Sequence, residues 1–236
     1  MEFSKLEGPI LLVVSHPDDE VLGFGASADK LSRLGIEIYT LIICGGAEKR
    51  YNGDDKDTLI KKCTKACKFL GMKETFFGSF PNLVLHNIDS YKIVGFIEKY
   101  IKEIKPRTIV THHPGDLNID HTVVSNACLT ACRLGQRRPD LKLPSINNIW
   151  FMEILSSTDW AYSTGKNIFS PNCFLSISEE NLNSKIDALN IYENVMRPRP
   201  HPRNEETIKS LAVMRGSQCG SSFAESFQLS FKYYAF

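Results

Sequence analysis

The first half of the chain alternates between short apolar runs and longer segments in which apolar residues recur every three or four positions. A short apolar run bounded by turn residues is typical of a buried strand, and the longer spacing is typical of an amphipathic helix. The predicted strands of this half are residues 10–15, 36–44, 74–77 and 108–112. The predicted helices are residues 20–34, 57–70, 88–104 and 120–133. Gly35, Gly71 and Pro106 follow three of these helices, as expected at helix ends.

The second half is less regular. It predicts strands at residues 149–155 and 173–177, and helices at residues 179–195 and 205–215. Between the two helices lies the run Arg197-Pro198-Arg199-Pro200-His201-Pro202-Arg203. This run cannot be helical, because each proline restricts the residue before it. An exposed connector and a functional loop are both compatible with it.

Repeated strand–helix–strand units predict a parallel sheet that is covered by helices on both faces. The expected fold class is therefore α/β, a Rossmann-like, doubly wound and mostly parallel sheet. The sequence contains no internal repeat, no low-complexity segment and no clear linker. We therefore expect one domain that spans residues 1–236.

Composition narrows the functional classes. The chain has 28 basic and 27 acidic residues, a net charge of +1, so no overall field attracts it to nucleic acid or to a membrane surface. No apolar run reaches the roughly 18 residues of a transmembrane helix. The N-terminal residues lack the pattern of a signal peptide, and seven cysteines without an export signal are typical of reduced thiols. We predict a cytoplasmic protein with a small-molecule substrate, and the composition leaves a homo-oligomer open.

The first loop carries the strongest chemical signal. His16, Asp18, Asp19 and Glu20 place an imidazole and three carboxylates directly after the first predicted strand. Ligands in open α/β sheets bind beyond the carboxyl ends of the strands. His16 and Asp19 can converge there on one metal ion, and both suit zinc. Asp18 would then act as a base, Pro17 restricts the turn, and Glu20 begins the helix.

A second cluster of histidine and aspartate residues follows the predicted strand of residues 108–112. A catalytic zinc ion usually has three protein ligands and a water molecule, so one ligand is still missing after His16 and Asp19. His121 is the predicted third ligand, and Asp120 beside it could orient a neighbouring group by a hydrogen bond. His112 and His113 are interpreted as ordinary polar residues at a strand end.

At these residues the sequence resembles the LmbE-like, or PIG-L, family of zinc-dependent de-N-acetylases. The resemblance spans about residues 10–231. The stretches that carry it are His16-Pro17-Asp18-Asp19-Glu20 and Asp116-Leu117-Asn118-Ile119-Asp120-His121. A subgroup of the family is also similar at Arg199-Pro200-His201-Pro202-Arg203, Arg215-Gly216-Ser217-Gln218 and Phe223-Ala224-Glu225-Ser226-Phe227. The resemblance implies that His16, Asp19 and His121 hold the metal, that Asp18 is the general base, and that Asp120 orients a catalytic histidine.

One position departs from the family pattern. Several members carry a histidine three residues before the last ligand, where this chain has Asn118. An amide can donate a hydrogen bond to an oxyanion, but it cannot supply a proton. Either Asp18 serves as both base and acid, or His201 provides the missing imidazole.

The resemblance also suggests substrate-binding residues. Asn82 stands where many relatives place an aspartate, and it can still hydrogen-bond a sugar hydroxyl. Thr158, Asp159, Arg199 and Arg203 could bind hydroxyls or a phosphate, since arginine suits phosphate and carboxylate groups.

The predicted reaction is the hydrolysis of an N-acetyl group on an N-acetylglucosamine-type sugar, which releases acetate and a free amine. The predicted cofactor is zinc, with another divalent transition metal as the alternative. Two other functions remain open, an amidase for a different N-acyl substrate, such as a thiol-sugar conjugate or an antibiotic precursor, and a non-catalytic metal-binding protein. A nucleotide-binding domain is disfavoured, because no G-x-G-x-x-G motif follows the first strand.

Overall fold

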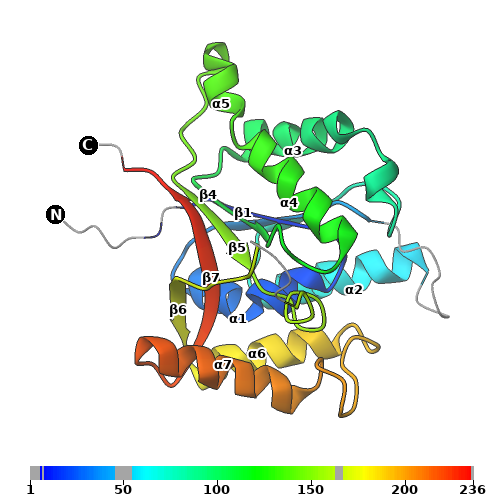
Figure 1. Cartoon of the computed structure of the whole chain (residues 1–236), viewed down its shortest axis with the longest axis vertical. Coiled ribbons are helices and arrows are strands. Elements are labelled where there is room, and N and C mark those ends of the chain that lie inside the picture. The colour runs from blue at the N-terminus through cyan, green and yellow to red at the C-terminus, as the bar shows by residue number, and fades with distance from the viewer. Residues whose placement is uncertain (1–5, 7, 46–54, 163–166, 235–236) are drawn as a thin grey trace.

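The computed structural model describes residues 6, 8–45, 55–162 and 167–234. Within these residues, seven strands form one sheet that is flanked by helices (Figure 1). The strands are β1 (Ile10–Val14), β2 (Ile38–Ile42), β3 (Glu74–Phe77), β4 (Thr108–His112), β5 (Asn148–Met152), β6 (Cys173–Ile177) and β7 (Phe223–Lys232). The helices are α1 (Asp19–Arg33), α2 (Lys56–Phe69), α3 (Ser90–Ile104), α4 (Ile119–Ala131), α5 (Leu134–Arg137), α6 (Glu179–Asn190) and α7 (Glu205–Cys219), with short 3₁₀ turns at Leu85–Asn87 and Pro139–Leu141.

The strand order is β3-β2-β1-β4-β5-β7-β6. The first five strands in this order are parallel, whereas β7 runs antiparallel to both β5 and β6. This arrangement confirms the predicted α/β class with a doubly wound, mostly parallel sheet. Among the described residues, no helix is both long and apolar enough to cross a membrane.

Strand β1 shows why the sheet is buried on both faces. Ile10, Leu12 and Val14 pack into one hydrophobic cluster, with residues of α1, α2, α6 and α7. Leu11 and Val13 point the other way and pack with residues of α3 and α4. Because side chains alternate along a strand, a continuous apolar run requires a helix layer on each face. Figure 1 shows these two layers on opposite sides of the sheet.

The chain reverses direction across the sheet between β1 and β4. From β1 it proceeds outward through β2 and β3, and then it returns to place β4 on the other side of β1. Such a switch point leaves a crevice at the carboxyl ends of the two strands, where ligands bind in folds of this kind. The first loop and the loop that follows β4 both end in this crevice.

Several predicted boundaries were wrong. The helix predicted at residues 179–195 ends at Asn190, and the segment up to residue 204 is irregular. The helix predicted at residues 88–104 begins at Ser90, after a 3₁₀ turn. The prediction also missed β7, which fills the gap between β5 and β6. Its buried half contains Glu225 and Ser226, and these polar residues interrupt the apolar pattern of a strand.

Candidate functional site

The turn between β1 and α1 is tightly fixed. The N–H of His16 donates to Asp19 Oδ2 at 3.0 Å, and the N–H of Asp18 donates to Glu20 Oε2 at 2.9 Å. Asp18 has a φ of 102°, a conformation that non-glycine residues rarely adopt. Glu20 is fully buried and also accepts a hydrogen bond from the hydroxyl of Tyr192. Hydrogen bonds to Asp19 and Glu20 thus fix the first loop, and these contacts stabilise the unfavourable backbone conformation of Asp18.

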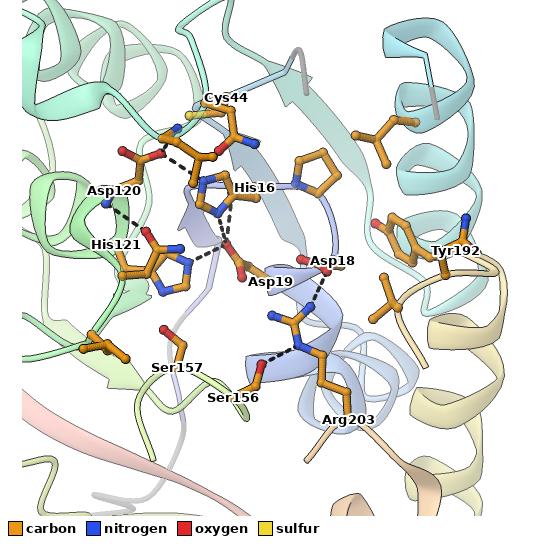
Figure 2. A pocket seen from close by; sticks show the side chains of 18 of the residues that line it. His16, Asp18, Asp19, Cys44, Asp120, His121, Ser156, Ser157, Tyr192 and Arg203 are labelled. Carbon is orange, nitrogen blue, oxygen red and sulfur yellow. Dashed lines mark hydrogen bonds and ion pairs between the residues drawn. The ribbon is translucent and has the colours of Figure 1, made fainter. Parts of the chain in front are cut away.

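His16, Asp19 and His121 converge at the bottom of the crevice (Figure 2). Asp19 Oδ2 lies 3.2 Å from His16 Nδ1 and also 3.2 Å from His121 Nε2. The three candidate ligand atoms all lie within 4.8 Å of one another. Zinc bonds of about 2.0–2.1 Å place neighbouring tetrahedral ligands about 3.3 Å apart. The donor types and their spacing therefore fit a zinc-sized cation, with His121 brought from the start of α4.

Each candidate histidine ligand has a carboxylate on its other ring nitrogen. Asp120 Oδ2 lies 3.1 Å from His16 Nε2, and Asp116 Oδ1 lies 3.2 Å from His121 Nδ1. Carboxylates in this position fix the orientation of a ligating imidazole and raise its basicity. Asp120 was predicted to orient a catalytic histidine; in the structure its partner is His16, one of the predicted metal ligands.

Asp116 begins the second motif, but no role of its own was predicted for it. It accepts hydrogen bonds from the hydroxyls of Ser157 and Thr158, the latter at 2.6 Å. Burial raises the pKa of Asp116, but His121 and these hydroxyls outweigh that effect and lower it to about 2. Asp116 is therefore a fixed negative charge behind His121. Nothing in the sequence links Asp116 to residues 157 and 158, because the contact is created by the fold.

His112 lies behind the candidate ligands rather than among them. It is fully buried, its ring stacks on that of His121 at 3.8 Å, and its Nε2 accepts the N–H of Ser15 at 2.8 Å. Burial, followed by the charge of His121, lowers the pKa of His112 to about 3. His112 is therefore neutral at physiological pH and packs against the ring of His121. The sequence suggested only an ordinary polar residue at a strand end.

Asp18 lies beside the candidate metal site and forms an ion pair with Arg203. Arg203 Nη1 lies 2.8 Å from Asp18 Oδ2, and Arg203 Nε donates to Ser156 Oγ at 2.8 Å (Figure 2). Burial raises the pKa of Asp18 to about 6, against the opposing charge of Arg203. The carboxyl group is thus ionised at neutral pH, yet it is a stronger base than an exposed aspartate.

These residues form the floor of a cavity of about 730 Å³. Asn82 and Asn118 line it, as does Arg203. Asn118 caps α4 by accepting the N–H of Asp120 on its Oδ1 at 2.9 Å, which leaves its NH₂ group available. Asn82 Oδ1 is buried and has no hydrogen-bond partner among the described residues, as expected of a group that awaits a ligand.

Four predicted residues do not line the cavity: Thr158, Asp159, Arg199 and His201. Thr158 instead donates a hydrogen bond from its hydroxyl to Asp116. His201 Nδ1 accepts the N–H of Arg203 at 3.0 Å, and the ring lies outside the lining. Arg199 forms an exposed ion pair with Glu206 at 2.9 Å. Asp159 accepts the N–H of Ser157 at 3.0 Å and helps to shape that loop. Their predicted roles stay predictions, and the geometry does not bring them to the floor of the site.

Comparison with known proteins identifies the chain's relatives. The model of the PIG-L family, described as GlcNAc-PI de-N-acetylase, matches residues 11–132. This match covers more than half of the chain and includes both His/Asp clusters. The chain belongs to the PIG-L family. The resemblance predicted from the two motifs is therefore confirmed.

A relative within the family is the uncharacterized deacetylase YaiS of Escherichia coli K12. It is 26% identical over 162 residues, which cover 66% of this chain and 85% of YaiS. Two solved structures share the fold. The N,N'-diacetylchitobiose deacetylase of Pyrococcus horikoshii has a TM-score of 0.73 at 17% identity and covers 93% of this chain and 82% of its own. GalB of Pseudomonas putida KT2440, a 4-carboxy-2-hydroxymuconate hydratase, has a TM-score of 0.74 at 17% identity. This match covers 96% of this chain and 98% of GalB. Because this fold is found with two different reactions, function must be argued from the site.

Proposed function

We propose that this PIG-L family protein is a metal-dependent deacetylase that hydrolyses the N-acetyl group of an N-acetylglucosamine-type sugar. The observation that carries the proposal is the convergence of His16, Asp19 and His121 beside the buried Asp18 carboxylate. Two imidazoles and one carboxylate leave coordination positions open, as in catalytic zinc sites, whereas structural zinc sites are closed by four ligands. Membership of a family described as a de-N-acetylase supports the same reaction.

The metal would be held by His16, Asp19 and His121, and zinc is the proposed ion. When bound there, a divalent cation polarises a carbonyl group and makes water more acidic. The carboxylates of Asp120 and Asp116 keep the two imidazoles turned toward Asp19. The protein thus supplies an oriented set of donors before any substrate arrives.

Asp18 is the proposed general base. It accepts a proton from the attacking water molecule as the new C–O bond forms at the amide carbon. Arg203 holds the carboxylate in place through their ion pair. When the C–N bond breaks, the protonated Asp18 returns this proton to the leaving amine. One residue acts in both steps, so no imidazole at His201 is required.

Asn118 is the proposed donor to the developing oxyanion. Its Oδ1 is occupied by the cap of α4, so its NH₂ group is the part left to face the cavity. A fixed donor of this kind stabilises charge that develops in the transition state. Asn82 lies on the same lining with an unpartnered Oδ1, which suits a sugar hydroxyl as its donor.

The test is acetate release from a panel of N-acetylated sugars by the zinc-loaded protein, with Asp18→Asn as the decisive variant. We expect turnover by the wild type, its loss on removal of metal by a chelator, and a fall in kcat of about 10²–10⁴-fold in D18N, the usual contribution of a general base. Zinc content measured by atomic absorption should be unchanged in D18N. Asp187→Asn, at an exposed position of α6, is the matched control and should behave as wild type.

Full activity in D18N would remove Asp18 from the role of base. A zinc-loaded wild type that is inert toward every N-acetylated sugar and N-acyl amide would contradict the deacetylase proposal itself. The same panel should include an unsaturated tricarboxylic acid such as 4-carboxy-2-hydroxymuconate, because GalB, a hydratase of that compound, shares the fold. Hydration of that compound in place of amide hydrolysis would assign the site to the other reaction.

A further inference from the structure

We propose that the floor of the cavity contains a second metal position, which binds cations softer than zinc and thereby inhibits the enzyme. Its donors are His16, Cys44 and Asp120, each of which offers one ligand atom, and these atoms lie within 4.8 Å of one another. On His16 the atom that faces Asp120 is Nε2, whereas the first metal position uses Nδ1. The effect on turnover rests on the deacetylase function proposed above, but binding of the cation does not.

Cys44 brings a sulfur ligand to the cavity. It follows β2 and lines the cavity, and Figure 2 shows it on the same side of the His16 ring as Asp120, with Asp19 on the other side. The N–H of Cys44 donates to the carbonyl of Ser15 at 2.8 Å, which fixes the backbone that carries the thiol. Thiolate ligands favour soft cations, whereas the first position offers only nitrogen and oxygen. A soft cation such as Cd²⁺ should therefore prefer the Cys44 side.

Asn82 provides a second sign of a ligand at this place. Its Oδ1 is buried and has no hydrogen-bond partner among the described residues. The residues on either side of it contact the proposed donors, because Cys44 Sγ donates to the carbonyl of Pro81 at 3.5 Å and the N–H of Leu83 donates to Asp120 Oδ2 at 2.5 Å. Buried polar atoms normally have a partner. An amide oxygen that binds a sugar hydroxyl in one state can complete the shell of a cation in the other.

His16 can serve only one of the two positions at a time. Its Nδ1 lies 3.2 Å from Asp19 Oδ2, and its Nε2 lies 3.1 Å from Asp120 Oδ2. A neutral imidazole has one nitrogen without hydrogen, and that nitrogen is the ligand atom. The tautomer with hydrogen on Nε2 donates to Asp120 and binds a metal beside Asp19. The other tautomer donates to Asp19 and binds a metal beside Cys44.

The two positions should therefore exclude each other. The ring already lies between two carboxylates at nearly equal distances, so the exchange of tautomer requires no large movement. A soft cation beside Cys44 displaces the thiol proton into water, as metal binding to cysteine does in general. It also leaves the first position with only Asp19 and His121. The cation thus inhibits by displacing the first metal and does not replace it in catalysis.

The experiment adds cadmium chloride to the zinc-loaded protein. It compares Cys44→Ser with Cys219→Ser, at an exposed cysteine outside the cavity lining. We expect a thiolate-to-cadmium charge-transfer band in the ultraviolet spectra of the wild type and C219S, and its loss in C44S. A zinc-binding dye should report about one zinc ion released for each cadmium ion bound.

Acetate release from N-acetylglucosamine measures the inhibition, relative to the rate of each variant without cadmium. Loss of a mere partner of a ligand weakens metal binding about 10–100-fold, so loss of the thiolate itself should raise the inhibiting cadmium concentration about 100-fold in C44S. C219S should be inhibited like the wild type. Cys44→Ala repeats the comparison with a side chain that has no ligand atom and buries no hydroxyl.

The spectra and the zinc release test the metal position even if no N-acetylated sugar is hydrolysed. A band of equal strength in C44S and the wild type overturns the proposal. Glu20, Cys63 and Cys67 form another possible donor group in the core, so a band that is lost in Cys63→Ala and kept in C44S would place the cation there instead. A Cys44-dependent band without zinc release would show that both cations bind together, which contradicts the exclusion.

Discussion

Asn118 combines a structural and a chemical role in one side chain. Its oxygen caps α4, and its NH₂ group is the proposed donor to the oxyanion. Asn118→Gly separates the two roles, because glycine at an N-cap costs only a few tenths of a kcal/mol relative to asparagine. We expect the free energy of unfolding to stay within about 0.5 kcal/mol of wild type while kcat falls about 10²-fold. Urea denaturation and steady-state kinetics measure the two quantities. A kcat within threefold of wild type would exclude Asn118 as the donor.

Asp116 contacts a candidate metal ligand, His121, and is not itself a candidate ligand. Its carboxylate lies 3.2 Å from His121 Nδ1, and two hydroxyls fix its position. Asp116→Asn keeps the shape but removes the charge that favours the metal-binding state of the imidazole. We expect the zinc affinity to fall about 10–100-fold, as for other partners of ligating histidines. Competition with a chromophoric chelator measures this change, with Asp140→Asn as the exposed control. An unchanged dissociation constant would show that Asp116 does not support the metal.

Helix α1 connects the site to the rest of the fold through a buried ion pair. Lys185 Nζ, from α6, donates to the carbonyl of Leu22 and to Glu225 Oε1, each at 2.7 Å. Glu225, from β7, also accepts the N–H groups of Ala26 and Ser27. Two side chains from distant segments thus hold the middle of α1, whose N-terminal end carries Asp19. Gly25 allows Lys185 to lie this close to α1, because a Cβ there would lie 3.0 Å from Lys185 Cγ.

Removing one partner of this pair should be costly. Glu225→Ala leaves the ammonium group of Lys185 buried without its counter-charge, and breaking a buried pair costs about 3–5 kcal/mol. We expect a loss of this size in the free energy of unfolding, measured by urea denaturation. Glu180→Ala, which breaks the exposed pair between Arg33 and Glu180, is the matched control and should leave the denaturation midpoint close to wild type. Equal effects of the two variants would show that burial does not strengthen the Lys185 pair.

The same contacts explain what the sequence could and could not predict. Strand β1 is an uninterrupted apolar run and β4 is rich in β-branched residues. Each is followed by a His/Asp loop, so both the fold class and the position of the candidate site followed from local pattern. Strand β7 was missed because the polar Glu225 interrupts its apolar pattern. Glu225 is tolerated there because it pairs with Lys185 of α6. Asp116 and His112 were missed as supports of His121 because their partners come from other elements. Local pattern predicts elements, whereas tertiary hydrogen bonds decide which polar residue supports which ligand.

At the scale of the whole molecule, the candidate metal would link the two halves of the switch point. His16 and Asp19 follow β1, whereas His121 opens the helix after β4, and these two strands are neighbours in the sheet. His121 lies more than 100 positions from the other two candidate ligands in sequence, so the set is assembled only in the folded chain. A metal that binds the folded state and not the unfolded chain stabilises the fold by mass action.

Zinc should therefore raise the melting temperature of the protein, independently of any substrate. Free zinc at about 100 times its dissociation constant contributes about 2.7 kcal/mol, which corresponds to a rise of about 5–10 °C for a chain of this size. A chelator should reverse the shift. His121→Ala should abolish it, whereas His86→Ala, at an exposed histidine outside the cavity lining, should retain it. Differential scanning calorimetry of the three proteins with and without zinc measures these shifts. If zinc raises the melting temperature of the H121A variant as much as that of the wild type, the metal binds elsewhere and the assigned ligand set is wrong.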